Sequence, residues 1–304
     1  MKKSSTYRIS SVILSILACF FISMQAHQVH AATLISENWD TGTPPDNWPN
    51  CTGTSTTFNG WYPRGWSDGC GAGAGLVTNI YHSAPRSFHN LRPAGSSWDK
   101  TSIVHDLPTH PGKIYVRFYL YLPSSGWSNF DDGPGSAGDE VVHFLFTNSA
   151  SSNTAFRINL YDNASDTWSP APECYGQGGV KYMTFALERN GGGGRGTEGA
   201  YPAGCYNMMS HFNEWHSYEW MIDATNNKVS YWIDGNPMYT NISAPVNDGG
   251  YTTINKLILS LFDSYAKNWQ ADCYIDDFVV SDTYIGPMPG TGTTPSPPSP
   301  PVLR

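Results

Sequence analysis

Apolar and polar residues alternate along most of the chain between residues 33 and 281, and this period of two predicts β-strands. The clearest case is the segment WHSYEWMIDATNNKVSYWIDG at 215–235. Turn-forming residues at 223–228 and the pair Asp234-Gly235 divide it into successive arms. We expect one face of the first arm to belong to the core, namely His216, Tyr218, Trp220 and Ile222. The segment therefore predicts three strands in series.

The same alternation predicts strands at 33–39, 87–91, 101–107, 114–122, 140–147, 155–161, 179–188, 256–262 and 272–281. No stretch has the period of a convincing amphipathic helix. Strands separated by turns rich in Gly, Asn and Pro are typical of sandwiches, jelly rolls and barrels. The fold class predicted is all-β, an antiparallel two-sheet jelly-roll sandwich.

The first 31 residues have the pattern of a secretory signal peptide. Three basic residues precede an apolar run at 12–24, and the small residue Ala31 marks the expected cleavage point. No other apolar stretch approaches the ~20 residues that cross a bilayer, so we expect an exported protein without a membrane span. The predicted organisation is a leader at 1–31, one jelly-roll domain at 32–285, and a Pro/Gly/Ser/Thr-rich linker or tail at 286–304, beyond which further domains could follow.

Charge and cysteine content narrow the partners and the compartment. Removal of the leader's three basic residues changes the formal net charge from −8 to −11, which argues against a nucleic-acid partner. Export makes disulfides plausible. Each of two cysteine pairs brackets a glycine-rich segment, and we expect Cys51 to pair with Cys70 and Cys174 with Cys205. The remaining Cys273 is expected to be buried as a small apolar residue.

Several strands combine an apolar face with a polar face that could bind sugars. At 115–122 the second face carries Arg117, Tyr119 and Tyr121, an unusual choice for a merely solvated surface. The strands at 140–147 and 155–161 add His143, Arg157, Asn159 and Tyr161. If these strands are neighbours, their polar groups converge on one surface together with Glu219 and Tyr182. A loop covering this face would instead make the same residues structural.

Such a surface would suit β-elimination on a polysaccharide that contains uronic acids. An Arg or Asn would neutralise the sugar carboxylate, a His or Tyr would remove the C5 proton, and a Tyr could protonate the leaving oxygen. The predicted catalytic residues are His143, Arg157, Tyr161 and Glu219, and the predicted substrate-binding residues are Arg117, Tyr119, Tyr121, Asn159, Tyr182 and Trp127. Glycoside hydrolysis has less support, because the chain has no compact pair of acids on one strand.

Two groups of acidic residues could hold calcium. The loop at 129–140 contains four carboxylates among glycines but matches no EF-hand spacing, so an ordinary solvated loop is favoured. The second candidate joins Glu37 near the first strand to Asp276 or Asp277 in the last strand, where an ion would tie the two ends of the domain together. No other cofactor is expected.

Three segments carry a family resemblance: SENWDTGTPPDNW at 36–48, EWHSYEWMIDATNNKVSYWIDG at 214–235 and CYIDDFVVSDTYIGP at 273–287. Together they resemble the concanavalin A-like lectin/glucanase superfamily, and within it most of all the laminin-G-like and polysaccharide-lyase-like members. The resemblance implies a jelly roll of two antiparallel sheets, a glycan on the concave sheet, and in some members a structural calcium. The alginate-lyase patterns are present only as fragments around His143 and Arg157, and the glucanase signature is missing.

Two functions follow as expectations. The first is a secreted carbohydrate-active enzyme, a polysaccharide lyase that acts through the polar face. The second is a non-catalytic glycan-binding or adhesion module of an extracellular protein, in which Tyr119 and Trp127 would contact the glycan. A structural surface protein without a ligand is the third alternative.

Overall fold

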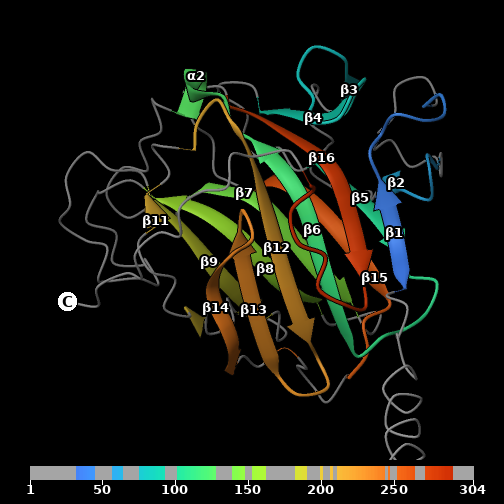
Figure 1. Ribbon diagram of the computed structural model, residues 1–304, viewed down its shortest axis with the longest axis vertical. Helices are drawn as coiled ribbons and strands as arrows, with labels where there is room; N and C mark the ends of the chain where they lie inside the picture. The colour runs from blue at the N-terminus through green and yellow to red at the C-terminus, as the bar shows by residue number, and fades with distance from the viewer. Residues whose placement is uncertain are drawn as a thin grey trace, which may run out of the picture. The chain divides into compact units, whose positions relative to one another are not determined.

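The computed structural model describes residues 32–44, 57–63, 75–92, 101–127, 139–147, 153–161, 182–189, 199–200, 206–207, 211–243, 246, 252–263 and 271–289. All its elements lie within Thr33–Arg304, which forms one compact unit. Two antiparallel β-sheets lie one over the other (Figure 1). The helix in the described residues is α2 (Ser124–Trp127), which has four residues. The described part of the chain contains no helix that is long and apolar enough to cross a membrane.

Sheet I has the strand order β14-β13-β12-β6-β16-β4-β3, with β1 also paired to β16. Its strands are β1 (Thr33–Glu37), β3 (Gly75–Val77), β4 (Ser87–Arg92), β6 (Lys113–Tyr121), β12 (Trp215–Asp223), β13 (Lys228–Ile233), β14 (Asn236–Ser243) and β16 (Ala271–Ser281). The pairing of β1 with β16 brings the two ends of the described domain together.

Sheet II has the order β10-β9-β8-β7-β15-β5-β2, with β11 paired to β9. Its strands are β2 (Tyr62–Pro63), β5 (Thr101–Asp106), β7 (Asp139–Thr147), β8 (Asn153–Tyr161), β9 (Tyr182–Arg189), β10 (Gly199–Ala200), β11 (Tyr206–Asn207) and β15 (Lys256–Asp263). The chain passes from β4 to β5 to β6, and later from β14 to β15 to β16, and so changes sheet at each step. The predicted fold class, an antiparallel two-sheet jelly-roll sandwich, is confirmed.

The core lies between the sheets and is rich in aromatic side chains. Phe118 of β6 packs against Trp220 of β12, with ring centroids 6.0 Å apart, and Trp61 packs against Phe278 of β16 at 5.3 Å. Leu257 and Leu259 of β15 contribute from sheet II and are fully buried. Because side chains alternate along a strand, this burial fixes which face of each strand points outward. The expected core residues Tyr218, Trp220 and Ile222 are buried as predicted.

The two turns predicted in the hairpin are present. Asp223 accepts a hydrogen bond from the Asn226 N–H at 2.9 Å, which closes the turn between β12 and β13. Asp234 and Gly235 both have positive φ, at 50° and 75°, as a tight two-residue hairpin connection requires. The register of β12, β13 and β14 is therefore set by these turns and by burial.

Candidate functional site

Six aromatic rings form a continuous row, which we call the aromatic row: His89, Tyr274, Tyr121, Trp215, His82 and Tyr119. The centroid distances between successive rings are 4.5, 5.9, 5.5, 5.8 and 3.7 Å. Tyr119 and Tyr121 alternate with the core residues Phe118 and Leu120 along β6, so the row lies on the outer face of sheet I.

The strand register explains the order of the rings. Tyr121 of β6 lies opposite Trp215 of β12 on one side and opposite Tyr274 of β16 on the other. His89 of β4 lies opposite Tyr274. Four adjacent strands therefore present four rings side by side, across roughly 14 Å at the usual spacing between strands.

The row offers partly exposed apolar surface together with hydrogen-bonding groups. His89, Tyr121 and Trp215 are half-buried, whereas Tyr274 is buried. The His89 Nε2 atom lies 2.7 Å from the carboxylate of Asp272. Burial and, secondly, the charge of Asp272 raise the pKa of Tyr274 to about 12, so its hydroxyl keeps its proton at neutral pH. Aromatic side chains of this kind combine a large contact area with a polar edge.

The other part of the same face is covered by the chain itself. Residues 282–289, which we call the C-terminal strap, follow β16 and lie over β6 and β12. Glu219 accepts hydrogen bonds from the Ile285 and Gly286 N–H groups, both at 2.8 Å. Arg117 donates to the Gly286 carbonyl at 2.9 Å, and the Tyr119 hydroxyl accepts from the Met288 N–H at 2.8 Å. Packing thus continues past residue 285, where we expected the domain to end.

These contacts assign Arg117 and Glu219 a role in holding the strap. Burial raises the pKa of Glu219, although the two backbone N–H groups and the charge of Arg117 act in the opposite direction. Both carboxylate oxygens of Glu219 are engaged by backbone donors. The carboxylate is therefore committed to structure, and its expected place in a catalytic surface is not supported.

The structure divides the expected catalytic set between the two sheets. Arg117 and Glu219 lie opposite one another on β6 and β12 of sheet I, where Tyr119 and Tyr121 also belong. His143, Arg157 and Tyr161 lie on β7 and β8 of sheet II. The condition for one shared surface, that these strands are neighbours, does not hold, because β6 and β12 belong to sheet I whereas β7 and β8 belong to sheet II.

Within sheet II, part of the expected set does come together along the backbone. His143 of β7 pairs in register with Arg157 of β8 and with Ser260 of β15. Tyr161 of β8 pairs with Tyr182 of β9, and Asn159 lies between Arg157 and Tyr161 on β8. The side chains of β7, β8 and β9, and those of Ser260 and of Trp127 in α2, lie outside the described part of the chain.

A buried network of acids joins β16 to the loop before β4. Asp276 accepts hydrogen bonds from the His82 and Ser83 N–H groups at 2.8 and 2.9 Å. Asp277 contacts the His82 ring and the Ser83 hydroxyl. Burial and then the charge of Asp277 raise the pKa of Asp276 to about 7. This network anchors the loop that carries His82.

The predicted calcium ligands lie next to this network. Glu37 accepts the Trp39 N–H at 2.6 Å, and burial raises its pKa. Asp277 is engaged with His82 and Ser83 as described above. Oxygen atoms of both Glu37 and Asp277 are thus engaged by donors of the protein itself. A calcium ion at these two residues stays a prediction.

Other predictions fall outside the described residues. These are the disulfide cysteines Cys51, Cys70, Cys174 and Cys205, and most of the acidic loop at 129–140. The unpaired Cys273 is buried and free, as expected.

Sequence reasoning missed four members of the aromatic row, namely Trp215, Tyr274, His89 and His82. Tyr274 and His89 occupy outward positions in strands that were predicted with nearly correct bounds, so the alternation alone could have placed them on the outer face. His82 lies in a loop and has no such signal. It reaches the row because Asp276 and Asp277 hold its backbone and ring.

Comparison with known proteins gives a likeness of fold. No protein family and no curated protein sequence matches the chain. Among solved structures, a cellulose-induced protein aligns with 84% of this chain and 100% of its own, at 16% identity and a TM-score of 0.44. A GH16 protein of the Bacteroides ovatus mixed linkage glucan PUL, solved with a product, aligns with 72% and 93%, at 10% identity and a TM-score of 0.45.

An alginate lyase from Chlorella virus is also similar, with 69% of this chain and 90% of that chain aligned, 11% identity and a TM-score of 0.40. With TM-scores below 0.5 and identities of 10–16%, the likeness supports no argument about this chain, and none of these activities is transferred to it.

Proposed function

We propose that the protein is a secreted carbohydrate-active protein that binds a glycan chain along the aromatic row. The observation that carries this proposal is the run of rings across β4, β16, β6 and β12, in which His89, Tyr121 and Trp215 are half-buried and Tyr274 packs between His89 and Tyr121. Half-buried rings lined up over several strands provide flat apolar surface for sugar rings, and the Tyr hydroxyls and the Trp215 indole supply hydrogen bonds to sugar hydroxyls.

The electrostatics favour a neutral glycan. The carboxylate of Asp272 is close to the row, and it is already engaged by His89. Arg117, a cation on this face, is 7% exposed and bound to the strap. The chain as a whole is acidic, with a formal net charge of −8. The negative charge of the protein would therefore repel a polyanion. Among the described residues, Arg117 is not available to offset this repulsion, because it is buried and bound to the strap.

The test is binding of the untagged mature chain to a panel of soluble glycans: mixed-linkage glucan, xylan, mannan and alginate. Affinity electrophoresis and calorimetry would detect binding, and Trp215→Ala and Tyr121→Ala should each weaken it by about tenfold or more. Tyr81→Ala is the matched control, because Tyr81 is 42% exposed and has no part in the row. If the wild type and the three variants bound glycan equally well, the aromatic row would be excluded as the binding surface.

A second candidate function is β-elimination on a uronic-acid polysaccharide by sheet II. The pairing of His143 with Arg157 supports it, because residues directly opposite on neighbouring strands have Cβ atoms about 5 Å apart. Arg157 would neutralise the carboxylate, and His143 or Tyr161 would take the C5 proton. The C4–O bond would break as the C4–C5 double bond forms, and a Tyr would give a proton to the leaving oxygen.

This second function uses no residue of sheet I, so it can be tested separately from glycan binding by the aromatic row. Incubation with alginate or glucuronan should raise the ultraviolet absorbance of the unsaturated product, and His143→Gln and Arg157→Ala should each remove most of that signal. His110→Gln is the matched control, because His110 is exposed and lies in the loop before β6. No absorbance change with folded wild-type protein would rule out the lyase and leave the binding proposal intact.

A further inference from the structure

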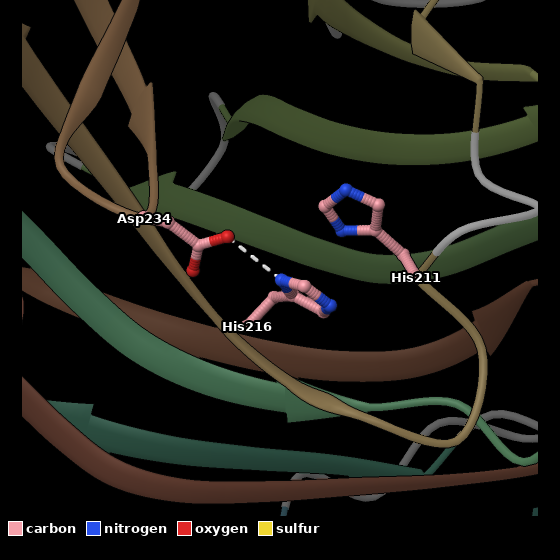
Figure 2. A group of neighbouring side chains, drawn as sticks. All are labelled: His211, His216 and Asp234. Atoms are coloured by element: carbon pink, nitrogen blue, oxygen red, sulfur yellow. Dashed lines mark hydrogen bonds and ion pairs between the residues drawn. The ribbon is translucent and has the colours of Figure 1, made fainter. Parts of the chain in front are cut away.

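Two histidines and an aspartate meet at one end of the β12–β13 hairpin (Figure 2). His211 lies in the segment before β12, His216 is the second residue of β12, and Asp234 follows β13 in the tight turn. One nitrogen from each histidine and one oxygen from Asp234 all lie within 4.8 Å of one another. Among the residues that the structure describes, this is the one group of His, Cys, Asp and Glu with such an arrangement.

Asp234 fixes the orientation and the tautomer of His216. Its Oδ2 atom lies 2.7 Å from His216 Nδ1, and its Oδ1 atom accepts the Ser217 N–H at 2.9 Å. An ionised carboxylate can only accept, so Nδ1 is the donor. In the neutral ring the lone pair is then on Nε2. That Nε2 atom is buried and makes no hydrogen bond within the described part of the chain. A carboxylate behind a histidine in this way is the usual support of a metal-binding imidazole.

His211 presents its imidazole to the same point. The two ring centroids are 3.8 Å apart, and His211 is 7% exposed. A neutral imidazole keeps a lone pair on one of its ring nitrogens, and that nitrogen can bind a metal ion.

The donor set selects the class of metal. Two imidazole nitrogens suit Zn²⁺, Cu²⁺ or Ni²⁺, whereas Ca²⁺ prefers oxygen ligands only. Zn–N bonds are about 2.0–2.1 Å long, so two ligand atoms in a tetrahedral site lie roughly 3.3 Å apart. One nitrogen of each histidine lies within 4.8 Å of the other, so the two rings would have to move only where that separation exceeds the value for a bound ion. Glu214 can add an oxygen ligand, because its Oε2 atom is 3.8 Å from His216 Nε2 and its side chain is 72% exposed.

We propose that His211 and His216 bind a divalent transition metal, with Zn²⁺ as the best match, that Glu214 supplies a carboxylate ligand, and that Asp234 orients His216. The ion would tie the segment before β12 to the hairpin. The site is distinct from the aromatic row in its residues and from the predicted calcium site in its donor atoms. Its existence does not depend on the proposed glycan binding.

The test is calorimetric titration of ZnCl₂ into untagged, chelator-treated mature chain, since a histidine tag would bind zinc itself. We expect one ion per chain. His216→Ala and His211→Ala should each lower the affinity at least a hundredfold, Asp234→Asn should lower it about 10–100-fold, and the control His110→Ala should leave it unchanged. The proposal would be overturned if folded wild-type protein did not bind Zn²⁺, or if both histidine variants bound it as tightly as the wild type.

A second measurement protects the test against a variant that does not fold. Co²⁺ added to the wild-type chain should give the visible absorption of a four-coordinate site with nitrogen and oxygen ligands, and excess Zn²⁺ should remove it. An intense near-ultraviolet band from a thiolate would assign the metal to cysteines and overturn the proposal. Zn²⁺ should also raise the melting temperature of the wild-type chain.

Discussion

The outer face of sheet I has two parts that are built on the same strands, β6 and β12, and differ in what their side chains contact. In the covered part, Arg117, Tyr119 and Glu219 hold the backbone of the strap. In the open part, Tyr121 and Trp215 contact other rings and stay half-exposed. The comparison shows that Arg117, Glu219 and even the aromatic Tyr119 can serve the chain's own backbone, whereas Tyr121 and Trp215 beside them keep accessible surface.

The largest expected effect is the loss of Glu219 from the covered part. Glu219→Ala would remove the acceptor of two buried backbone N–H groups, and a hydrogen bond to a charged group contributes about 1.5–3 kcal/mol. Two such bonds lead us to expect that the free energy of unfolding falls by about 4 kcal/mol in urea titrations. Glu214→Ala in metal-free buffer should change it by less than about 0.5 kcal/mol. Similar values for the two variants would mean that the strap is not anchored through Glu219.

The acid network beneath His82 predicts a pH dependence. The pKa of Asp276 is about 7 in the folded protein, above the ordinary value of 3.8, so between these two values the folded protein holds a proton that the unfolded chain has released. Stability from this group is therefore present at low pH and lost as the pH rises towards 7. A pKa difference of this size corresponds to at most about 4 kcal/mol, and we expect about 2 kcal/mol.

The measurement is the melting temperature of the wild-type chain and of Asp276→Asn between pH 4 and 7. The asparagine cannot titrate but can still accept from the His82 and Ser83 N–H groups. The wild type should lose more stability than the variant across this range. Parallel profiles would show that Asp276 titrates as an ordinary carboxylate.

A smaller effect is expected at the end of the strap. Tyr119→Phe would remove the hydroxyl that accepts the Met288 N–H while keeping the ring stacked on His82. The loss of one such hydrogen bond costs about 1 kcal/mol, which urea titration can resolve. Tyr121→Phe is the matched control, since no hydrogen bond of its hydroxyl to the strap is present in the described residues. The strap contact would be unimportant if both variants were equally stable.

The smallest effect on stability is expected in the open part. Trp215→Ala removes a half-exposed ring, and we expect the free energy of unfolding to fall by no more than about 1 kcal/mol in the same titration. If glycan binding falls about tenfold while stability is nearly kept, the open part is a ligand surface. A loss of stability as large as that of Glu219→Ala would instead make Trp215 part of the packed structure.

Alternation in the sequence was sufficient to locate most of the strands. The predicted strand at 272–281 differs by one residue from β16 (Ala271–Ser281), and both hairpin turns were found, because burial on one face requires a period of two and tight turns require particular residues. The pattern also separated core residues such as Phe118 from outward residues such as Tyr119.

His216 shows where the pattern failed. Its position in β12 matches that of Tyr218 and predicts a core residue, yet it lies at the end of the strand and contacts Asp234 and His211. A period of two says which side of a strand a residue takes. It does not say that the core extends to that end of the strand.

The sequence by itself determined the strands, their inward faces, the turns of the hairpin and the sandwich class, since these depend on local alternation and turn chemistry. Only the tertiary structure decided which strands share a sheet, and so separated Glu219 from His143. It also decided that the strap covers Arg117 and that His211 meets His216. The physical reason is that pairing between strands far apart in the chain and packing of a terminal segment depend on the burial and hydrogen bonding of the whole assembly, which no local pattern records.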